Sequence, residues 1–310
     1  TIPSYSEIKE LIESNPETLF IGPSYIEIEL TGKCSMDCLF CYRKSLASGE
    51  HGNMNPGTFE KILSGMRDFS LPYTVCFSGS GEPMEHPEFY SMMDSCVKES
   101  LVEQVIIETN GIFTDGNFKS FMSKPENSKV KVIINNNGLD AASYMRFHKT
   151  DGFDKVLKNI QSLRELNSDS ERVYIQIMKI NETDEIGNEN EVKSYLDKYY
   201  DFWEGEKIPI ILQKQNVYFG RIPDRRYSDL SPVKRISCWH LQRDLYVLSD
   251  GTVSFCKQDI DGESSYGNIN TESLKEIWNR QKNSFINDYE GNFPDKPRCK
   301  DCDEWYTFNF

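Results

Sequence analysis

Three closely spaced cysteines constrain this chain more than any other feature of its sequence. Cys34, Cys38 and Cys41 stand in a C-x3-C-x2-C spacing, directly after the strand-like run at residues 25–30. Three thiolates on one short loop can hold three irons of a 4Fe–4S cube and leave the fourth iron open to another ligand. The spacing therefore predicts a reaction site. A zinc site is the alternative, because thiolates also bind zinc readily.

Charge and hydropathy limit the classes of protein to which the chain can belong. Its 310 residues include Asp+Glu 49 and Lys+Arg 35, which gives a formal net charge of -14. Such a chain repels phosphate backbones, so we expect no nucleic-acid substrate. Apolar runs such as residues 208–212 are far too short to span a membrane, and the N-terminus lacks the pattern of an export signal. We therefore expect a cytoplasmic protein with no membrane partner.

The periodicity of the sequence predicts an α/β fold. β-branched and aromatic runs alternate with helix-like stretches, as in a parallel sheet with crossover helices. We expect strands at residues 25–30, 73–78, 104–108, 131–134, 173–179 and 208–213, and crossover helices at residues 56–69, 88–98, 114–123, 153–167 and 189–203. Six such units form a partial (β/α)6 barrel of the TIM type, whose ligands bind at the C-terminal ends of the strands. The cysteine loop follows the first strand and falls at that end.

The same pattern divides the chain into four parts. Residues 1–24 form an N-terminal extension with a helix expected at 4–14, and residues 25–216 form the barrel. Residues 217–236 form a polar linker to a small module at 237–310, for which we expect a β-hairpin and a helix. This module holds four cysteines, namely Cys238, Cys256, Cys299 and Cys302. Clustered cysteines of a cytosolic chain are typical metal ligands, whereas Cys76 and Cys96 lie in apolar stretches and are expected to be buried bystanders.

The cysteine loop resembles the signature of one enzyme superfamily. The run from Cys34 to Cys41 reads CSMDCLFC. It resembles the motif of the radical S-adenosylmethionine (SAM) enzymes, including the aromatic residue, here Phe40, just before the third cysteine. The resemblance implies that Phe40 lies beside the bound cofactor.

The loop after the second expected strand resembles the superfamily's Gly-Gly-Glu-Pro motif, which binds the amino group of the methionine part of SAM. It reads Ser80-Gly81-Glu82-Pro83, so Ser80 departs from the usual first glycine. The resemblance implies that Ser80, Gly81 and Glu82 bind the cofactor. Glu82 is also a suitable cap for the helix expected after this loop, and that structural role is the alternative.

Two later strand ends complete the resemblance. Asn110, which stands in Thr109-Asn110-Gly111, follows the third strand and is similar to a turn that lines the cofactor pocket of the superfamily. Asn135 ends the fourth strand, where the superfamily places a small polar residue on the ribose. The resemblance thus implies that both asparagines bind the cofactor. Asn before Gly is also a favourable turn pair, which is the alternative for Asn110.

The resemblance implies a radical mechanism. The open iron would chelate SAM, and one electron from a flavodoxin- or ferredoxin-type donor would release a 5′-deoxyadenosyl radical that abstracts hydrogen from a substrate. The protein then has to position the target C–H bond and exclude water. The sequence assigns no further catalytic residue. The 4 histidines show no metal-ligand spacing, and no catalytic triad stands out.

The C-terminal cysteines resemble a SPASM or twitch module that carries an auxiliary cluster. Cys238 and Cys256 frame a hairpin turn signal at Gly251, and Cys299 with Cys302 forms a C-x2-C pair. Full SPASM modules have further cysteines and hold two auxiliary clusters. Four cysteines suffice for one fully ligated 4Fe–4S cluster, so we expect two clusters in the whole chain. A zinc ion held by the same four thiolates is the alternative.

The module also suggests a reaction class. A fully ligated auxiliary cluster is suited to electron transfer, as in the similar twitch-bearing aminocyclitol dehydrogenase that oxidises 2-deoxy-scyllo-inosamine. The last third of the chain also resembles the spiro-SPASM proteins, whose longer forms carry an N-terminal nucleotidyltransferase-like domain, so we expect a domain boundary at Thr1. We therefore expect an oxidoreductase that acts on a small polyol, aminocyclitol or sugar-like molecule. A peptide-modifying SPASM enzyme and a non-catalytic electron-transfer protein are the alternatives.

Overall fold

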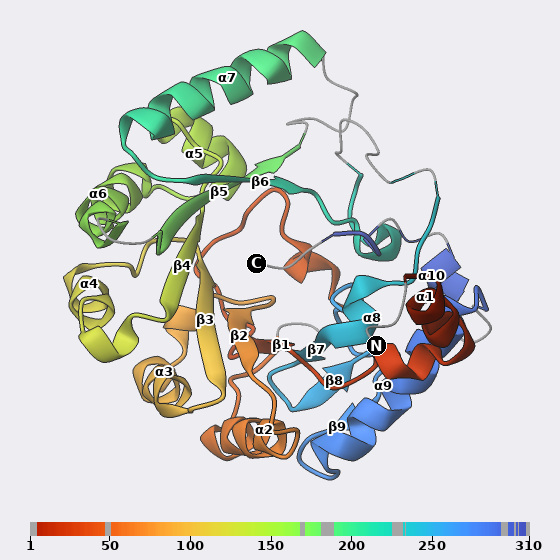
Figure 1. The fold of residues 1–310 in the computed structure, drawn as a ribbon. Helices are drawn as coiled ribbons and strands as arrows, with labels where there is room; N and C mark the ends of the chain where they lie inside the picture. The colour runs from red at the N-terminus through yellow and green to blue at the C-terminus, as the bar shows by residue number, and fades with distance from the viewer. Residues whose placement is uncertain are drawn as a thin grey trace.

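A computed structural model describes residues 5–46, 51–167, 171–180, 189–224, 232, 234–292, 297–300, 302 and 304–307. The described strands form one nine-stranded sheet in the order β6-β5-β4-β3-β2-β1-β7-β8-β9 (Figure 1). They are β1 (Tyr25–Glu29), β2 (Tyr73–Ser78), β3 (Val102–Thr109), β4 (Val130–Asn135), β5 (Val173–Lys179), β6 (Ile210–Lys214), β7 (Asp244–Val247), β8 (Thr252–Ser254) and β9 (Gly267–Asn268).

The α-helices of the described chain alternate with the barrel strands and then gather in the C-terminal part. They are α1 (Tyr5–Ser14), α2 (Pro56–Arg67), α3 (Phe89–Lys98), α4 (Gly116–Met122), α5 (Ala141–His148), α6 (Phe153–Leu163), α7 (Glu189–Gly205), α8 (Trp239–Arg243), α9 (Leu274–Tyr289) and α10 (Pro297–Lys300). Short 3-10 turns occur at Pro16–Leu19, Tyr42–Ser45, Pro83–Glu85, Pro125–Asn127, Arg164–Asn167 and Tyr218–Gly220. No helix in these described segments has both the length and the apolar character needed to cross a membrane.

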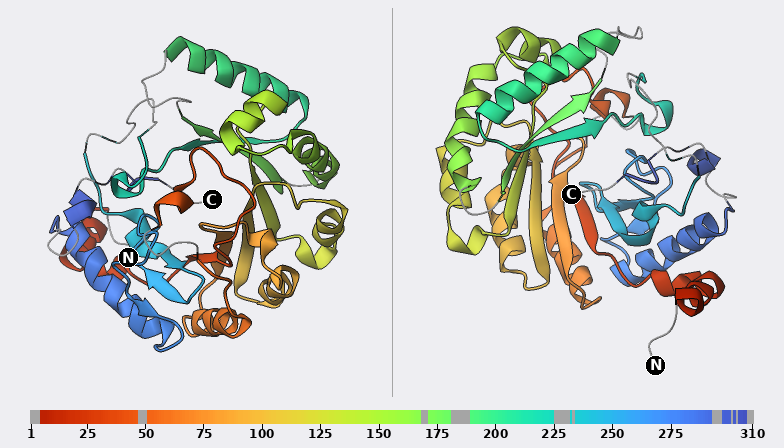
Figure 2. Two further views of the ribbon diagram at one scale, coloured as in Figure 1. Left: turned by 180° about the vertical axis from the view of Figure 1, so that it is seen from behind. Right: turned by 45° about the horizontal axis from the view of Figure 1, so that its top comes forward.

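Strands β1 to β6 are parallel and form an open barrel. Each pairs with its neighbour in sequence order, and the helices from α2 to α7 lie around the outside of the sheet (Figures 1 and 2). The sheet curves around a central space toward which the C-terminal ends of the strands point. This architecture confirms the predicted α/β fold and partial barrel.

Helix α5 (Ala141–His148) corrects the predicted set of helices, which had no element between the fourth strand and residue 153. It begins with a capping box, in which the side chain of Asp140 accepts from the backbone N–H of Ser143. Its last turn contacts the cysteine loop, because the N–H of Leu39 donates to the carbonyl of Phe147 over 2.7 Å. The unpredicted helix therefore bears directly on the site.

The C-terminal hairpin continues the barrel sheet. Strand β7 pairs in parallel with β1, with Tyr25 opposite Asp244, and β8 returns antiparallel to β7. Gly251 lies in the turn between them with a φ of 87°, a conformation that glycine adopts without strain. The predicted hairpin is confirmed, and its pairing with β1 places the residues after β8 at the open side of the barrel (Figure 2).

The inner face of the barrel changes from apolar to polar along the strands. A buried apolar cluster fills the part of the barrel nearer the N-terminal ends of the strands. It consists of Tyr25, Cys76, Ile106, Ile133 and Ile211. Two residues further along the same strands, the inward positions are polar, namely Glu27, Ser78, Glu108, Asn135 and Gln213. Because side chains alternate between the two faces of a strand, these polar groups lie inside the barrel next to the apolar cluster, nearer the C-terminal ends of the strands.

Candidate active site

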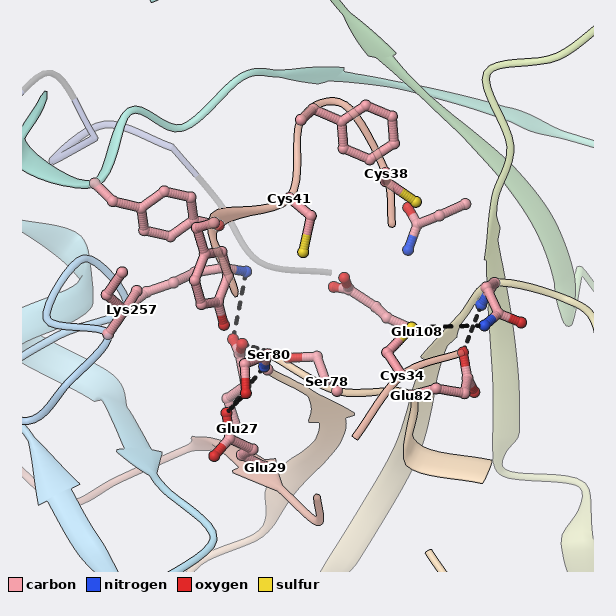
Figure 3. A pocket seen from close by; sticks show the side chains of 18 of the residues that line it. Glu27, Glu29, Cys34, Cys38, Cys41, Ser78, Ser80, Glu82, Glu108 and Lys257 are labelled. Carbon is pink, nitrogen blue, oxygen red and sulfur yellow. Dashed lines mark hydrogen bonds and ion pairs between the residues drawn. The ribbon is translucent and has the colours of Figure 1, made fainter. Parts of the chain in front are cut away.

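The C-terminal ends of the barrel strands surround a cavity of about 200 Å³. The thiols of Cys34, Cys38 and Cys41 point into it from different sides (Figure 3). Glu108 reaches it from β3, and Lys257 reaches it from the segment that follows β8. The cavity thus lies where ligands bind in barrels of this type, and it is shared by the barrel and the C-terminal module.

A close approach between two loops fixes the position of the cysteine loop. The N–H of Glu82 donates to the carbonyl of Lys33 over 2.7 Å. Gly81 permits this approach, because a Cβ atom there would lie 2.1 Å from the carbonyl oxygen of Thr31. The glycine of the second-strand motif therefore has a steric role in bringing that loop against the cysteines.

The thiols of the cysteine loop surround the cavity instead of gathering at one point. No three His, Cys, Asp or Glu side chains of the described residues form a group that could hold a single metal ion. A 4Fe–4S cube, in which each thiolate binds a different iron, fits the spread positions of Cys34, Cys38 and Cys41. Burial raises the pKa of Cys34 to about 11 and also raises that of Cys38. The positive charge of bound iron would offset this penalty and favour the thiolates.

Glu82 accepts three hydrogen bonds inside the protein. The hydroxyl of Thr109 and the N–H of Asn110 each donate to its carboxylate over 2.8 Å. The N–H of Met84 donates over 3.2 Å, so Glu82 also caps the 3-10 turn that follows it. Burial raises the pKa of Glu82 to about 7, although the hydrogen bonds oppose this shift. The residue is therefore both a cap and a buried carboxylate that links the second and third strand ends.

Ser80, the departure from the usual glycine, is committed to a neighbouring carboxylate. Its N–H and its hydroxyl donate to Oε2 of Glu29 over 2.9 and 2.5 Å. The ring of His51 lies on the other oxygen, with Nδ1 2.7 Å from Oε1. Although burial opposes it, the bonds from His51 and Ser80 lower the pKa of Glu29. Ser80 lines the cavity, and it holds an ionised Glu29 beneath the loop.

The other predicted cofactor residues also line the cavity, and two of them have partners within the protein. Asn110 accepts from the N–H of Ile112 over 2.9 Å, as a turn residue does, while its Nδ2 lies 3.9 Å from Sγ of Cys34. Asn135 accepts from Gln176 over 2.6 Å. Phe40 borders the cavity beside the cysteines. All of the residues predicted from the barrel motifs are thus brought together at one place.

His148, the last residue of α5, is a site residue that the sequence motifs did not indicate. Its Nδ1 lies 3.3 Å from Sγ of Cys38, and its Nε2 accepts from the N–H of Asn137 over 3.0 Å. Burial lowers the pKa of His148 to about 4, so its ring is neutral at neutral pH. No sequence signal marked it, because it lies far along the chain from the cysteine loop and outside any metal-ligand spacing.

Three charged residues on the cavity wall were also missed. Nζ of Lys257 lies 3.4 Å from Oε2 of Glu27, whose other oxygen accepts from the hydroxyl of Ser78. The side chain of Glu108 points into the cavity near Lys257 (Figure 3), whose charge acts on its carboxylate. Although burial opposes it, Glu27 and Glu108 raise the pKa of Lys257. Glutamates alternate with isoleucines in β1, and this pattern in a buried strand could have indicated Glu27 from the sequence.

The four C-terminal cysteines line a second, smaller cavity of about 30 Å³. Arg235 braces it, because its Nη1 donates to the carbonyls of Cys299 and Cys302 over 2.7 and 3.3 Å. Asp288 pairs with Arg235 over 2.9 Å and accepts from the N–H of Cys238 over 2.5 Å. Cys256 completes the lining. The four predicted auxiliary ligands thus line one small cavity, as the ligands of a second cluster would.

Comparison with known proteins agrees with this geometry. Residues 28–188, just over half of the chain, match the radical SAM superfamily, and residues 238–303 match the SPASM iron-sulfur cluster-binding domain. An uncharacterized protein of Treponema pallidum (strain Nichols) is 26% identical over 312 residues, which cover 97% of this chain and 84% of that protein.

Two solved structures share the fold. The structure of SuiB of Streptococcus suis bound to precursor peptide SuiA has a TM-score of 0.67 at 15% identity, covering 90% of this chain and 70% of that one. The structure of BtrN in complex with AdoMet and 2-DOIA has a TM-score of 0.53 at 17% identity, covering 90% of this chain and 92% of that one. At these identities the likeness concerns the fold alone. By its motifs, its fold and the two family matches, the chain belongs to the radical SAM superfamily and carries a C-terminal SPASM iron-sulfur domain.

Proposed function

We propose that this radical SAM enzyme oxidises a small polyhydroxylated molecule, such as a polyol, an aminocyclitol or a sugar-like compound, and that one auxiliary cluster accepts an electron. Bound SAM would supply a 5′-deoxyadenosyl radical that takes a hydrogen atom from a carbon of the substrate. One observation carries the proposal: the inner face of the barrel is polar at the level of the cavity.

The polar level offers many hydrogen-bonding groups in a small space. It consists of Glu27, Ser78, Glu108, Asn135, Gln176 and Gln213, all of which line the cavity. Hydroxyl groups both donate and accept, so a polyol can pair with carboxylates and amides at once. Some of these groups already pair with one another in the described structure, but an apolar substrate would leave any group without such a partner, such as the side chain of Glu108, buried and unpaired, at a cost of roughly 1–3 kcal/mol for each. The lining therefore favours a substrate with several hydroxyl or amino groups.

The charges around the cavity narrow the substrate further. Five carboxylic acids line it, namely Glu27, Glu29, Glu82, Glu108 and Asp259, whereas Lys257 is the one Lys or Arg among its described lining residues. Acidic groups outnumber the lysine even though burial raises the pKa of Glu82 and of Glu108, and this excess of negative charge repels phosphate and carboxylate groups in a cavity of low dielectric constant. The lining thus favours a neutral or cationic substrate and opposes a phosphorylated one.

Lys257 supports a connection between the substrate level and the auxiliary site. It follows Cys256 directly in the sequence and lines both cavities. A substrate held near Lys257 and Glu108 would lie one residue away from an auxiliary-cluster ligand. This short separation supports transfer of an electron from a substrate radical to the auxiliary cluster.

Several assignments enter the proposal as predictions. The cofactor would be held by Phe40, Ser80, Gly81, Glu82, Asn110 and Asn135, and the two clusters by the three plus four cysteines. We also predict the four-part division of the chain, a cytoplasmic location and a flavodoxin- or ferredoxin-type electron donor. Each of these is open to direct test with the full-length protein.

Matched substrate pairs test the proposal. Anaerobically reconstituted and reduced enzyme should be offered scyllo-inosamine, glucosamine and glucosamine 6-phosphate, together with a panel of peptides. Mass spectrometry of small molecules that co-purify with the full-length protein should add further candidate substrates to this set. With carbon-deuterated substrates, we expect deuterium in 5′-deoxyadenosine and an oxidised product from the unphosphorylated compounds only.

A pair of variants on one strand provides the control. Glu108→Gln should lose most of the substrate turnover, whereas Glu103→Gln, at an exposed position of the same strand, should keep it. Both should still cleave SAM slowly without substrate. Deuterium transfer from peptides alone would replace the proposal with peptide modification, and preferred turnover of the phosphorylated compound would contradict the charge argument.

A further inference from the structure

His148 contacts a ligand of the predicted SAM-binding cluster from outside the cysteine loop. Its Nδ1 lies 3.3 Å from Sγ of Cys38, a normal distance for a hydrogen bond to sulfur. The residue is buried and ends α5, the helix that the sequence did not predict. It lies outside the motif segments from which the site was predicted.

The other ring nitrogen determines which tautomer His148 adopts. The backbone N–H of Asn137 lies 3.0 Å from Nε2 and can only donate a hydrogen bond. Nε2 must therefore be the unprotonated acceptor, which leaves the single proton of the neutral ring on Nδ1. That proton faces Sγ of Cys38. The hydrogen-bond network thus makes His148 a donor to the thiolate, and this assignment depends on geometry alone.

The surroundings keep the ring from turning away. The ring centroid of Tyr144 lies 4.4 Å from that of His148, and the ring centroid of Phe40 lies 5.7 Å from it in an edge-on arrangement. Asn137, whose N–H donates to Nε2 of His148, is itself fixed. Its side chain donates to the carbonyl of Met178 on β5 over 2.8 Å and accepts from the N–H of the same residue over 3.1 Å. A rotation of His148 would break this network and leave the N–H of Asn137 without its acceptor.

The opposite side of the cysteine loop has a much weaker counterpart. Nδ2 of Asn110 lies 3.9 Å from Sγ of Cys34, at the far limit of contact with sulfur. The cluster thiolates are therefore not equivalent in this chain. Cys38 has the close side-chain donor, and its loop is tied to the same helix through the bond between Leu39 and Phe147.

We propose that His148 is a positioning residue for the SAM-binding cluster. It donates a hydrogen bond from Nδ1 to the Cys38 thiolate and thereby raises the reduction potential of the cluster. Hydrogen bonds to cluster sulfurs stabilise the reduced, more negative state, and partners outside the ligand set orient the ligands themselves. The inference does not depend on the identity of the substrate. It concerns how readily the cluster takes up the electron that every reaction of the enzyme needs.

The test compares variants that keep or remove the donor. The background is Cys299→Ala/Cys302→Ala, so that only the SAM-binding cluster contributes to the signal. His148→Phe removes donor and acceptor, while His148→Gln keeps an amide that can donate to Cys38 and accept from Asn137. We expect a redox titration followed by electron paramagnetic resonance to show a more negative potential for His148→Phe and a largely restored one for His148→Gln.

Tyr144→Leu is the matched packing control. It removes one ring that lies against His148, but the bond from the N–H of Asn137 to Nε2 still holds the donor toward Cys38. The variant should therefore lower the melting temperature without moving the potential. An unchanged potential in iron-loaded His148→Phe would overturn the proposal. An equal shift in Tyr144→Leu would do the same, because it would reduce His148 to a packing residue.

A measurement on the unmodified residue decides the matter if His148→Phe fails to bind iron. In the same auxiliary-cysteine background, protein labelled with ¹⁵N-histidine should show a ¹⁵N hyperfine coupling to the reduced cluster. This background removes the second cluster, beside which His240 lies. A spectrum without any ¹⁵N coupling would show that no histidine bonds to the cluster ligands, and would refute the proposal.

Discussion

Nζ of Lys257 lies 3.4 Å from Oε2 of Glu27, so a residue beside an auxiliary cysteine forms an ion pair with the first strand of the barrel. The Lys257 side chain is 23% exposed and that of Glu27 is 8% exposed, so the pair is largely withdrawn from bulk water. Glu108 faces the same lysine. One cation therefore compensates two carboxylates in the cavity.

Lys257→Met should destabilise the protein by about 3 kcal/mol, because breaking a buried pair leaves carboxylates without their counter-charge. Urea unfolding of the cluster-free protein at pH 8 is the measurement. Lys275→Met, at an exposed position of α9, is the matched control and should have little effect. Adding Glu27→Gln to Lys257→Met should recover part of the loss. A double variant as unstable as Lys257→Met alone would mean that the pair is not the cause.

Glu82 should make the stability of the cluster-free protein depend on pH. Its pKa is about 7 in the folded protein instead of the usual 4.5, so the folded state keeps a proton that the unfolded chain releases between these values. The contribution of Glu82 to the free energy of unfolding is fully present below pH 4.5 and is lost as the pH rises through 7. The total loss is about 3 kcal/mol.

The comparison that isolates this effect is wild type against Glu82→Gln at pH 5 and pH 8. The variant lacks the titrating group, so its stability should fall less than that of the wild type over this interval. Constant offsets from lost hydrogen bonds cancel in the difference between the two pH values. Parallel stability curves for the two proteins would contradict the prediction.

The elements that the sequence predicted well are those with a strong repeating pattern. The six strands lie within a few residues of their predicted positions, because continuous apolar runs such as that of β1 are characteristic of buried parallel strands. Helix α5 was missed because it is short and opens with small and polar residues. Its stability comes from the capping box at Asp140 and from the contact of Phe147 with the cysteine loop, and neither leaves a periodic signal.

The candidate site was predictable only where its chemistry follows a local motif. The cysteines, Gly81 and Glu82 stand in short runs whose spacing carries information. The pairing of Lys257 with Glu27 and the contact of His148 with Cys38 join residues far apart in the chain. Such contacts depend on the register between β7 and β1 and on the placement of α5, which composition and periodicity do not determine.

Gly81→Ala should separate the second-strand loop from the cysteine loop. Its Cβ would lie 2.1 Å from the carbonyl oxygen of Thr31, a backbone atom that cannot move away alone. We expect a loss of about 2 kcal/mol in stability from overpacking and much weaker SAM binding in calorimetry. Gly205→Ala, with nothing within 4 Å of the added atom, is the matched control. Unchanged SAM affinity in Gly81→Ala would show that the close approach is dispensable.

Metal content should report both cysteine groups separately. Anaerobic reconstitution should give about eight irons and eight sulfides for each chain, because three plus four cysteines suit two 4Fe–4S clusters. Replacing Cys34, Cys38 and Cys41 with alanine should leave about four irons. Stoichiometric zinc together with only about four irons in the unmodified protein would instead assign the C-terminal cysteines to a zinc ion.

Arg235→Lys should selectively weaken the auxiliary site. The guanidinium of Arg235 bonds to the carbonyls of Cys299 and Cys302 and to Asp288, which in turn holds the N–H of Cys238. A lysine ammonium lacks the fixed fork of donors and cannot make all of these bonds at once. Because a metal site supplies much of the folding energy of a small module, the weakened brace should loosen the C-terminal region as well.

We expect Arg235→Lys to lose up to about four irons on anaerobic desalting, while SAM cleavage without substrate stays at the level of the unmodified protein. Product formation should fall with the auxiliary iron, because the substrate radical would lose its electron acceptor. Lys300→Met, an exposed change in α10 close to the same cysteines in sequence, is the control and should retain all iron. Full auxiliary iron in Arg235→Lys would show that the cysteines hold their cluster without the brace. Full product formation after auxiliary iron loss would instead make this cluster structural.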